Sequence, residues 1–310
     1  MIITFTGNTS LDHILFVPEI PTSGTVRASR AFESMGGKGT DASWILSKLG
    51  IPSLALGFIA GRNGERIKEM LQEQNVETDF VAVEGESRRN VVIINESDSQ
   101  QVTYTAPSLQ VETKHIEKLF SSYKVALSRA SCVVLAGTLP NNVPPDLYTE
   151  IIELARAKRI PVVFDASEPF LSAGLAAGPN FAKPNLPELE ALVGHPLPNI
   201  DDVHTVGREL QQRHGTALII SLGDQGGLAV LPNLTYRIPP ITVDVVNSSG
   251  AGDGILAGLA YSLSAGMSIE DGLRLGFGIA TAVLLSPRTA DFDPTASERF
   301  HAEIDLIPIK

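Results

Sequence analysis

Short apolar runs alternate with longer amphipathic stretches along most of the chain. The apolar runs have the length and composition of β-strands, and they predict strands over residues 2–6, 51–57, 79–83, 132–136, 161–164, 181–183 and 216–222. The amphipathic stretches predict helices over residues 40–49, 63–74, 145–158 and 201–213, and another helix that starts near Pro187. Strands that alternate with helices build βαβ units, so we expect an α/β fold with a doubly wound, mostly parallel sheet and helices on both faces.

Two stretches interrupt this alternation. Residues 14–31 carry β-type side chains punctuated by Pro18, Pro21 and Gly24, and residues 90–105 have the pattern of a β-hairpin. Neither stretch has room for a helix. We therefore expect a small β-sheet lid, formed by residues of about 11–34 and 87–106, on a single domain that spans residues 1–310.

The composition is that of an ordinary globular protein, with 43% apolar and 19% charged residues in a chain of 310. A net charge of −11 excludes a protein that tracks nucleic-acid backbones, which needs basic patches, but it does not exclude local binding of a small anion. Cys132 is the single cysteine, so an internal disulfide and a cysteine-based zinc site are excluded. No apolar run approaches the length of about 20 residues that a membrane span needs, so we expect no membrane partner and a cytoplasmic protein.

The first candidate site is the glycine-rich segment Gly36-Gly37-Lys38-Gly39, which precedes a predicted helix. Glycines at such a place let the backbone approach a ligand closely, and the free N–H groups of the helix start favour an anion or hydroxyl oxygens. Lys38 adds a cation. Because Gly39 follows the lysine, the segment does not fit the Walker A pattern. An ordinary junction between a loop and a helix remains the alternative.

The second candidate site is Gly250-Ala251-Gly252-Asp253, which also opens a predicted helix. The N–H groups of Gly250, Ala251 and Gly252 can form an anion hole. Asp253 is then placed beside it as a base that takes a proton from an attacking hydroxyl. The alternative is an acidic residue in a first helical turn that only complements the helix dipole.

Two further motifs follow predicted strands. Asn185 and Glu188 are three residues apart, so both can face one ligand, and an amide and a carboxylate suit Mg²⁺ bound through water or phosphate. An N-cap with a first-turn glutamate is the alternative. Residues 221–226 lie at the carboxyl end of a predicted strand, where ligands gather in open α/β sheets. Their alternative is a tight hairpin turn into a strand over residues 228–231.

Together these motifs resemble those of the PfkB (ribokinase-like) carbohydrate kinases, in the same order, from about Thr6 to about Pro294. Residues 36–39 resemble the first family signature, Gly-Gly-Lys-Gly, and residues 250–253 resemble the second, Gly-Ala-Gly-Asp. Residues 185–188 match the family's Asn-x-x-Glu element, which is tied to Mg²⁺ and phosphate. Residues 221–226 look like its nucleotide-binding turn.

The resemblance implies a ribokinase-like fold with a β lid that often serves as a dimer contact, so a homodimer through the lid is expected. It implies ATP as co-substrate, Mg²⁺, and a sugar or sugar phosphate as acceptor. Asp12 would contact the sugar hydroxyls and Asp253 would be the catalytic base. The nucleotide would lie between residues 221–226, residues 250–252 and the helix near residues 276–280. The residues implied for nucleotide binding are Ser221, Gly223, Gly226, Asn185 and Ser248.

The branch of the family is indicated by residues 87–91, Ser-Arg-Arg-Asn-Val, which resemble a stretch of 1-phosphofructokinase and tagatose-6-phosphate kinase. Residues 136–140 and 164–167 and Asn247 also resemble that branch. A phosphorylated sugar needs cations nearby, since guanidinium groups bind phosphate oxygens in pairs. The candidate cations are Arg27, Arg30, Lys38, Arg88 and Arg89. The expected substrate-binding residues are Asp12, Gly36, Gly37, Lys38, Asp41, Arg27 and Arg88.

Other residues depart from that branch. Asp41 stands where the family usually has Asn, and a carboxylate there would either repel a phosphate or accept hydrogen bonds from hydroxyls. Residues 7–12 are closer to ribokinases and nucleoside kinases. Residues 105–108 lack the Pro-Gly-Pro that often follows the lid hairpin. A kinase of an unphosphorylated sugar or nucleoside therefore stays open. So does a non-catalytic sugar- or nucleotide-binding relative, although such a protein has no use for Asp253 beside an anion hole.

Overall fold

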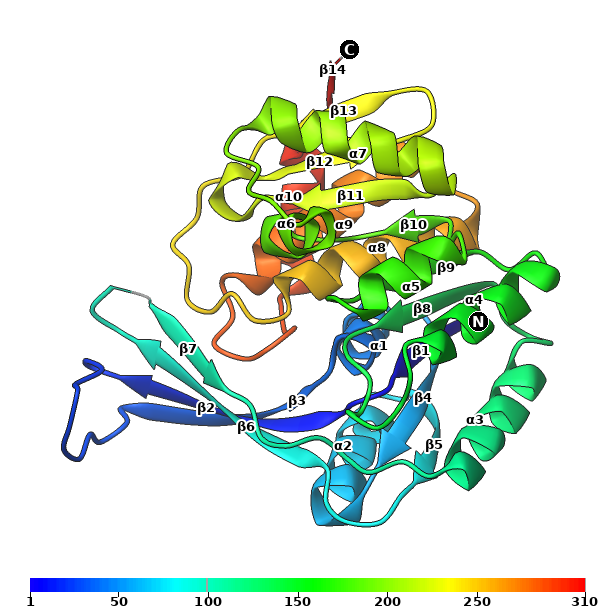
Figure 1. Ribbon diagram of the computed structural model, residues 1–310. Coiled ribbons are helices and arrows are strands. Elements are labelled where there is room, and N and C mark those ends of the chain that lie inside the picture. Colours follow the sequence, from blue (N-terminus) through cyan, green and yellow to red (C-terminus); the bar gives the residue numbers. More distant parts are fainter. Residues whose placement is uncertain (99, 310) are drawn as a thin grey trace.

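A ten-stranded sheet forms the centre of the computed structural model, which describes residues 1–98 and 100–309 (Figure 1). Seven neighbouring strands are parallel, in the spatial order β11 (Ala217–Ser221), β10 (Phe181–Ala182), β9 (Val162–Asp165), β8 (Cys132–Ala136), β1 (Ile2–Thr6), β4 (Ser53–Ile59) and β5 (Glu77–Ala82). Antiparallel strands extend the sheet beyond β11: β12 (Gly227–Val230), β13 (Thr235–Ile238) and β14 (Ile307–Ile309). The predicted mostly parallel sheet is confirmed.

Helices cover both faces of this sheet, because successive strand side chains point to opposite sides. Ile2 and Cys132 pack on one side and their neighbours Ile3 and Val133 on the other. The first side carries α1 (Lys38–Lys48), α2 (Gly61–Glu73), α8 (Ala251–Ala265), α9 (Ile269–Val283) and α10 (Pro294–Glu303). The second carries α3 (Thr113–Ala126), α4 (Asp146–Ala157), α5 (Phe170–Ala176), α6 (Leu186–Val193) and α7 (Ile200–His214) (Figure 1). The predicted doubly wound architecture is therefore confirmed.

Glycines bring α8 and α9 into close contact. A Cβ atom added to Gly258 would lie 2.5 Å from the Cα of Gly276, and one added to Gly254 would lie 2.8 Å from the backbone nitrogen of Ala280. Any side chain at these positions would push the two helices apart. This packing fixes the amino-terminal end of α8, which carries the second glycine-rich motif.

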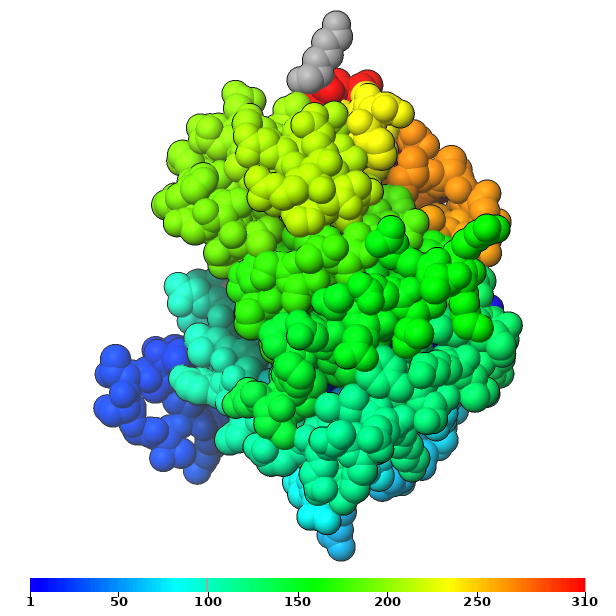
Figure 2. Space-filling model, turned by 45° about the vertical axis from the view of Figure 1, so that its right-hand side comes forward, coloured from blue at the N-terminus to red at the C-terminus, as the bar shows by residue number. Residues whose placement is uncertain are grey.

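The two stretches that interrupt the strand–helix alternation form a separate four-stranded sheet. Its order is β3 (Arg30–Gly36), β2 (Ser10–Val17), β6 (Arg88–Asn95) and β7 (Gln101–Tyr104), and only β2 and β6 run parallel within it. The small sheet extends from the main body at the carboxyl end of β1 (Figure 1). The exposed residues 18–29, which join β2 to β3, project furthest from the body at lower left in Figure 2. That this sheet acts as a lid remains a prediction.

Candidate active site

The sequence motifs converge at the carboxyl edge of the parallel strands. From β1 the chain passes to β4 and β5 on one side, and then returns to β8 and the strands beyond it on the other. Such a switch point leaves a crevice at the carboxyl ends of the strands, where ligands of open α/β sheets bind. Asn8 follows β1, Asp165 ends β9, and Lys183 follows β10 at this edge.

The second glycine-rich motif forms the start of α8. Gly250 is the N-cap residue with a φ of 85°, and a Cβ atom there would lie 2.4 Å from the backbone nitrogen of Ala290. A Cβ atom on Gly252 would meet only the ammonium end of Lys183, at 3.2 Å. The helix start lies beside Lys183, and of its first N–H groups that of Ala251 donates a long hydrogen bond of 3.4 Å to the backbone oxygen of Ser248. A helix start next to a lysine suits an anion.

A cluster of charges lies beside this helix start; Asp165 and Lys183 are buried in it, and Lys38 and Glu188 are partly exposed. The Nζ atom of Lys38 lies 2.6 Å from Oδ1 of Asp165 and 3.2 Å from Oε1 of Glu188. The Nζ atom of Lys183 lies 2.9 Å from Oδ2 of Asp165. Burial opposes the charge on Asp165, but the two lysines offset it and hold the pKa of this carboxyl below its usual value.

Asp253 lies in the first turn of α8, within the field of the same cluster. Burial raises the pKa of Asp253 to about 7, with Lys38 and Lys183 opposing the shift and Asp165 and Glu188 adding to it. A carboxyl group whose pKa lies near the working pH suits a general base. Asp253 also lies in the first turn of α8, as the helix-dipole alternative expects, so its role as the base stays a prediction.

A second group of polar side chains lies where strands β2 and β6 of the small sheet meet α1 and the loop after β1. We call this group the carboxylate pocket, and its members are Asn8, Asp12, Asp41, Arg88 and Asn90. Oδ1 of Asp12 accepts hydrogen bonds from Ser10 Oγ and Asn90 Nδ2, both at 2.8 Å. Nη2 of Arg88 donates to the backbone oxygen of Asn8 at 3.2 Å. Burial raises the pKa of Asp12, against these hydrogen bonds and the nearby Arg88.

Three polar atoms of the carboxylate pocket are buried without a hydrogen-bond partner among the described residues. They are Oδ1 of Asn8, Oδ1 of Asp41 and Nε of Arg88. Buried polar groups in proteins nearly always have partners, so orphaned atoms that gather in one place indicate a ligand site. The set offers an acceptor, a carboxyl group and a cationic donor, which suit a hydroxylated anion.

The five candidate cations lie in different parts of the structure. Arg27 is exposed in the segment of residues 18–29 and makes no ion pair with the described residues. Arg30 pairs with Glu96 and Arg89 with Glu33, all at the surface. Lys38 belongs to the cluster around Asp165. Of the five candidates, Arg88 is the one that is held in the carboxylate pocket.

The predicted nucleotide residues line a cleft of about 690 Å³ between β11, α8 and α9, which we call the apolar cleft. Ser221, Gly223, Gly226, Asn185 and Ser248 all border it, together with Ala251 and Gly252. Phe277 and Ala280, from the helix expected to border the nucleotide, also line the cleft. Its other walls, which the sequence analysis did not single out, include Pro239, Pro240, Ile241 and Val243.

The turn after β11 also forms the tight turn considered from the sequence. A 3₁₀ helix over Gly223–Gln225 joins β11 to the antiparallel β12. A Cβ atom on Gly226 would lie 2.1 Å from the backbone oxygen of Ile238. The same residues therefore form the tight turn between β11 and β12 and part of the wall of the apolar cleft.

Asn185 and Glu188 form the N-cap of α6. Oδ1 of Asn185 accepts from the N–H of Glu188 at 2.8 Å, and Oε2 of Glu188 accepts from the N–H of Asn185 at 3.0 Å. Within residues 1–98 and 100–309, no group of three or more His, Cys, Asp or Glu side chains is arranged to hold a metal. These residues fit a Mg²⁺ ion that keeps its waters and phosphate ligands, and they do not fit a metal caged by protein.

The small sheet is hydrogen-bonded to the loop that precedes α8. Nε2 of Gln101, the first residue of β7, donates to Ser249 Oγ at 2.6 Å. Its Oε1 accepts from Ser248 Oγ at 3.1 Å. Gln101 therefore joins the small sheet to a residue of the apolar cleft, two positions before Gly250.

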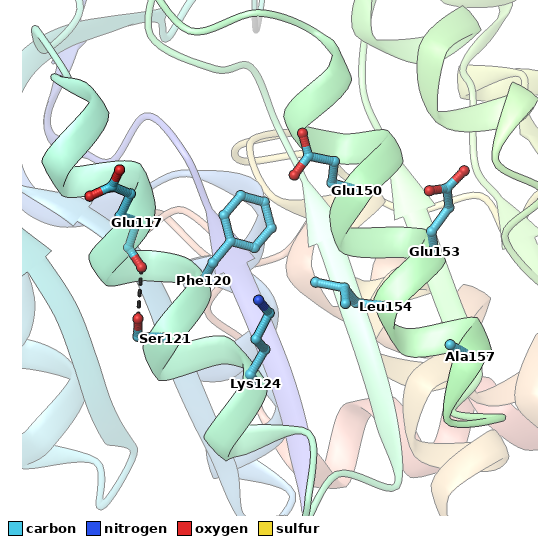
Figure 3. A pocket seen from close by; sticks show the side chains of 8 residues that line it. All are labelled: Glu117, Phe120, Ser121, Lys124, Glu150, Glu153, Leu154 and Ala157. Carbon is cyan, nitrogen blue, oxygen red and sulfur yellow. Dashed lines mark hydrogen bonds between the residues drawn. The ribbon is translucent and has the colours of Figure 1, made fainter.

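A second groove, of about 590 Å³, lies between α3 and α4 (Figure 3). Phe120 and Leu154 face each other at its centre, and the carboxylates of Glu117, Glu150 and Glu153 lie around them (Figure 3). None of its lining residues belongs to the motifs above.

Residues 3–296 match the family described as pfkB family carbohydrate kinase. The chain belongs to this family. It is 32% identical over 294 residues to a 1-phosphofructokinase of Bacillus subtilis (strain 168), which covers 94% of this chain and 96% of the relative. It is 26% identical over 319 residues to a tagatose-6-phosphate kinase of Staphylococcus epidermidis, which covers all of both chains. These kinases confirm the resemblance to the sugar phosphate branch.

The fold is shared with solved structures of the family. A structure described as a possible 1-phosphofructokinase from Thermotoga maritima matches with a TM-score of 0.91 at 27% identity, over 100% of this chain and 99% of that one. The protein is therefore a carbohydrate kinase with the predicted fold class. Among the helices formed by the described residues, none is long and apolar enough to cross a membrane.

Proposed function

We propose that this pfkB family kinase transfers the γ-phosphoryl group of ATP to a hydroxyl group of a sugar phosphate, as a 1-phosphofructokinase does. The sugar phosphate occupies the carboxylate pocket and ATP the apolar cleft, with its phosphates at the start of α8. Asp12, Asp41 and Asp253 are all buried. The small sheet therefore has to move for a sugar to enter, as a lid would.

The residues around the start of α8 have separate roles in the reaction. Asp253 takes the proton of the attacking hydroxyl as its oxygen bonds to the γ-phosphorus, and ADP leaves with the electrons of the broken P–O bond. The N–H groups of Gly250, Ala251 and Gly252 bind the charge that is spread over the transferred oxygens. Lys38 and Lys183 offset further charge. Glu188, acting through water, would help to hold a Mg²⁺ ion on the nucleotide phosphates, and such an ion would offset their charge.

The proposal that the substrate is a sugar phosphate rests on Arg88. Its guanidinium group is largely buried, its Nε has no partner among the described residues, and it lies beside Asp12, which is expected to contact the sugar. Burial lowers the pKa of Arg88, and Asp12 opposes this shift, so the group keeps its charge. A buried guanidinium with a free donor suits a phosphate already present on the sugar.

A kinase screen tests the proposal. ADP release is measured with ATP, Mg²⁺ and one acceptor at a time: fructose 1-phosphate, fructose 6-phosphate, tagatose 6-phosphate, ribose, fructose or a nucleoside. We expect turnover with one or more sugar phosphates. Turnover of ribose, fructose or a nucleoside with none of the sugar phosphates would overturn the substrate class, and binding without any turnover would favour the non-catalytic relative.

We also propose that the protein forms a homodimer through the outer face of the small sheet. The strand register places a group of apolar side chains on that face next to the polar His13, Glu33 and Arg89; the apolar group is Leu15, Val91, Ile93, Val102 and Tyr104. Val102 is 38% exposed and Tyr104 is 60% exposed, which is unusual for neighbouring apolar groups. Sedimentation of wild type and Tyr104→Asp tests this: we expect a dimer and a monomer, and a monomeric wild type contradicts the proposal.

A further inference from the structure

Asp41 has the least favourable surroundings of the three carboxyl groups near the carboxylate pocket. Asp12 accepts two hydrogen bonds and lies near Arg88, and Asp253 has lysines nearby. Asp41 is 4% exposed, and its Oδ1 has no partner among the described residues. Burial raises the pKa of Asp41 well above its usual value, and the nearby carboxylates of Asp253 and Asp12 raise it further. A hydrogen bond with the Gly37 backbone opposes the shift only weakly.

The elements packed against α1 supply no cation that compensates Asp41. The facing strands β1, β4 and β8 contain no charged residue, and Asp253 is the only charged residue of α8. On β3, Arg30 is paired with Glu96, and Glu33 is paired with Arg66 and Arg89. The charged side chains of α2 lie at its surface, while Gly64, Ile67, Met70 and Leu71 form its buried face. Lys38, on the same helix as Asp41, is engaged by Asp165 and Glu188.

We propose that Asp41 stays protonated and donates a hydrogen bond from its carboxyl group to a hydroxyl of the sugar phosphate. The inference rests on the proposed function, because it assigns the bound hydroxyl to a sugar phosphate. Neighbouring carboxylates raise one another's pKa, and the proton stays on the group whose charge no cation or donor stabilises. Asp41 is then the neutral member of the set, next to Asp12 and Asp253.

A protonated Asp41 resolves a difficulty that the sequence raises, namely an acidic residue in a pocket that should bind a phosphorylated sugar. A carboxylate there would repel the substrate phosphate, and it could only accept hydrogen bonds. A protonated carboxyl group has no charge, and it offers a donor where most of the family offers the N–H of an asparagine. Asp41 then contributes to selection of the acceptor and still allows an anionic substrate.

The pH dependence of kcat/KM for fructose 1-phosphate tests the inference, with Asp41→Asn as the matched variant. In wild type we expect kcat/KM to fall at alkaline pH as Asp41 ionises. Asp41→Asn is neutral at every pH, so its kcat/KM should lose the alkaline fall whatever its value near neutral pH. Asp41→Ala removes the donor and should raise KM about tenfold, the usual size of one lost hydrogen bond. An unchanged alkaline fall in Asp41→Asn overturns the proposal.

Infrared difference spectroscopy gives a readout that needs no turnover. At a pH of about 8, where ordinary carboxyl groups are ionised, we expect the carbonyl stretch of a protonated carboxyl group in wild type. It should vanish in Asp41→Asn and persist in Asp12→Asn, with thermal unfolding confirming that each variant is folded. A missing band overturns this inference. A band that depends on Asp41, with no sugar phosphate accepted in the screen, overturns the proposed function.

Discussion

The carboxylate pocket is lined by charged and amide side chains, whereas the apolar cleft is lined mainly by glycine, proline and apolar side chains, with a few polar ones such as Asn185, Ser221 and Ser248. In the pocket, three polar atoms are left without partners. In the cleft, the turn at residues 223–226 and the start of α8 present backbone groups, and Phe277 and Ala280 form a wall.

This difference indicates two modes of recognition in one site. Orphaned charged groups select a ligand by the hydrogen bonds that it must supply, because a wrong ligand leaves them unpaired. Backbone groups and apolar walls select mainly by shape. Single substitutions should therefore affect the two substrates separately, except at the charge cluster where the two regions meet.

Asp253 lies at that meeting point, and its loss should have the largest effect. Asp253→Asn preserves the shape and removes the base, so kcat should fall by about 10²–10⁴-fold while both substrates still bind. Steady-state kinetics gives kcat, and calorimetry with ATP and with fructose 1-phosphate gives binding. Full activity in a folded variant would exclude Asp253 as the base.

The pH dependence of kcat/KM should show the same group. The quantity that reports the ligand-free enzyme is kcat/KM. Because Asp253 acts unprotonated and its pKa lies at about 7, kcat/KM of wild type should fall about tenfold per unit below that pH, or about 100-fold near pH 5. Residual activity of Asp253→Asn should not follow this acid limb. A wild-type profile that stays flat down to pH 5 would contradict the assignment.

Arg88→Ala tests the charged side of the comparison. Loss of a charge-assisted hydrogen bond should raise KM for fructose 1-phosphate by about 10–100-fold and leave KM for ATP nearly unchanged. Arg89→Ala is the matched control, since Arg89 is exposed and pairs with Glu33 on the outer face of the small sheet. Equal effects of the two variants would remove Arg88 from phosphate recognition.

Ala280→Leu tests the apolar side. The larger side chain intrudes into the cleft that Ala280 lines, so KM for ATP should rise about tenfold with little change in KM for fructose 1-phosphate. A rise in the sugar phosphate KM alone would place ATP elsewhere.

Gln101→Ala should have the smallest effect, because it removes the three hydrogen bonds of this side chain to residues 248–249, and in the proposed arrangement Gln101 contacts neither substrate. We expect both KM values to rise by about threefold together, roughly what a partly exposed hydrogen bond contributes. Gln100→Ala, at the exposed neighbouring position, serves as the control. A change in only one KM would show that Gln101 does not link the two regions.

The sequence predicted the fold well because burial on both faces leaves clear apolar runs. The strand expected over residues 51–57 lies at Ser53–Ile59 instead, since Pro52 cannot donate a backbone hydrogen bond to the sheet. The helix Thr113–Ala126 was missed, although its buried His115, Leu119 and Tyr123 recur every four residues.

The candidate site was predictable as motifs but not as a charge network. Lys38 and Asp165 are 127 positions apart, and Asp165 meets Lys183 only because β9 pairs with β10. The same limit explains why Arg27 and Arg88 could not be ranked: both are arginines of predicted lid segments, and only three-dimensional pairing buries one of them. The roles of the site residues remain predictions for the experiments above.

The Gln101 contact has a consequence for side reactions. A kinase with a bound nucleotide and no acceptor can pass the phosphoryl group to water, so the closure that excludes water decides how much ATP is hydrolysed without product. Gln101 holds the free-edge strand of the small sheet against the loop before α8. Under the proposed function, closure of the small sheet is tied to the loop before the anion hole, so we expect the ratio of futile hydrolysis to sugar phosphorylation to depend on Gln101.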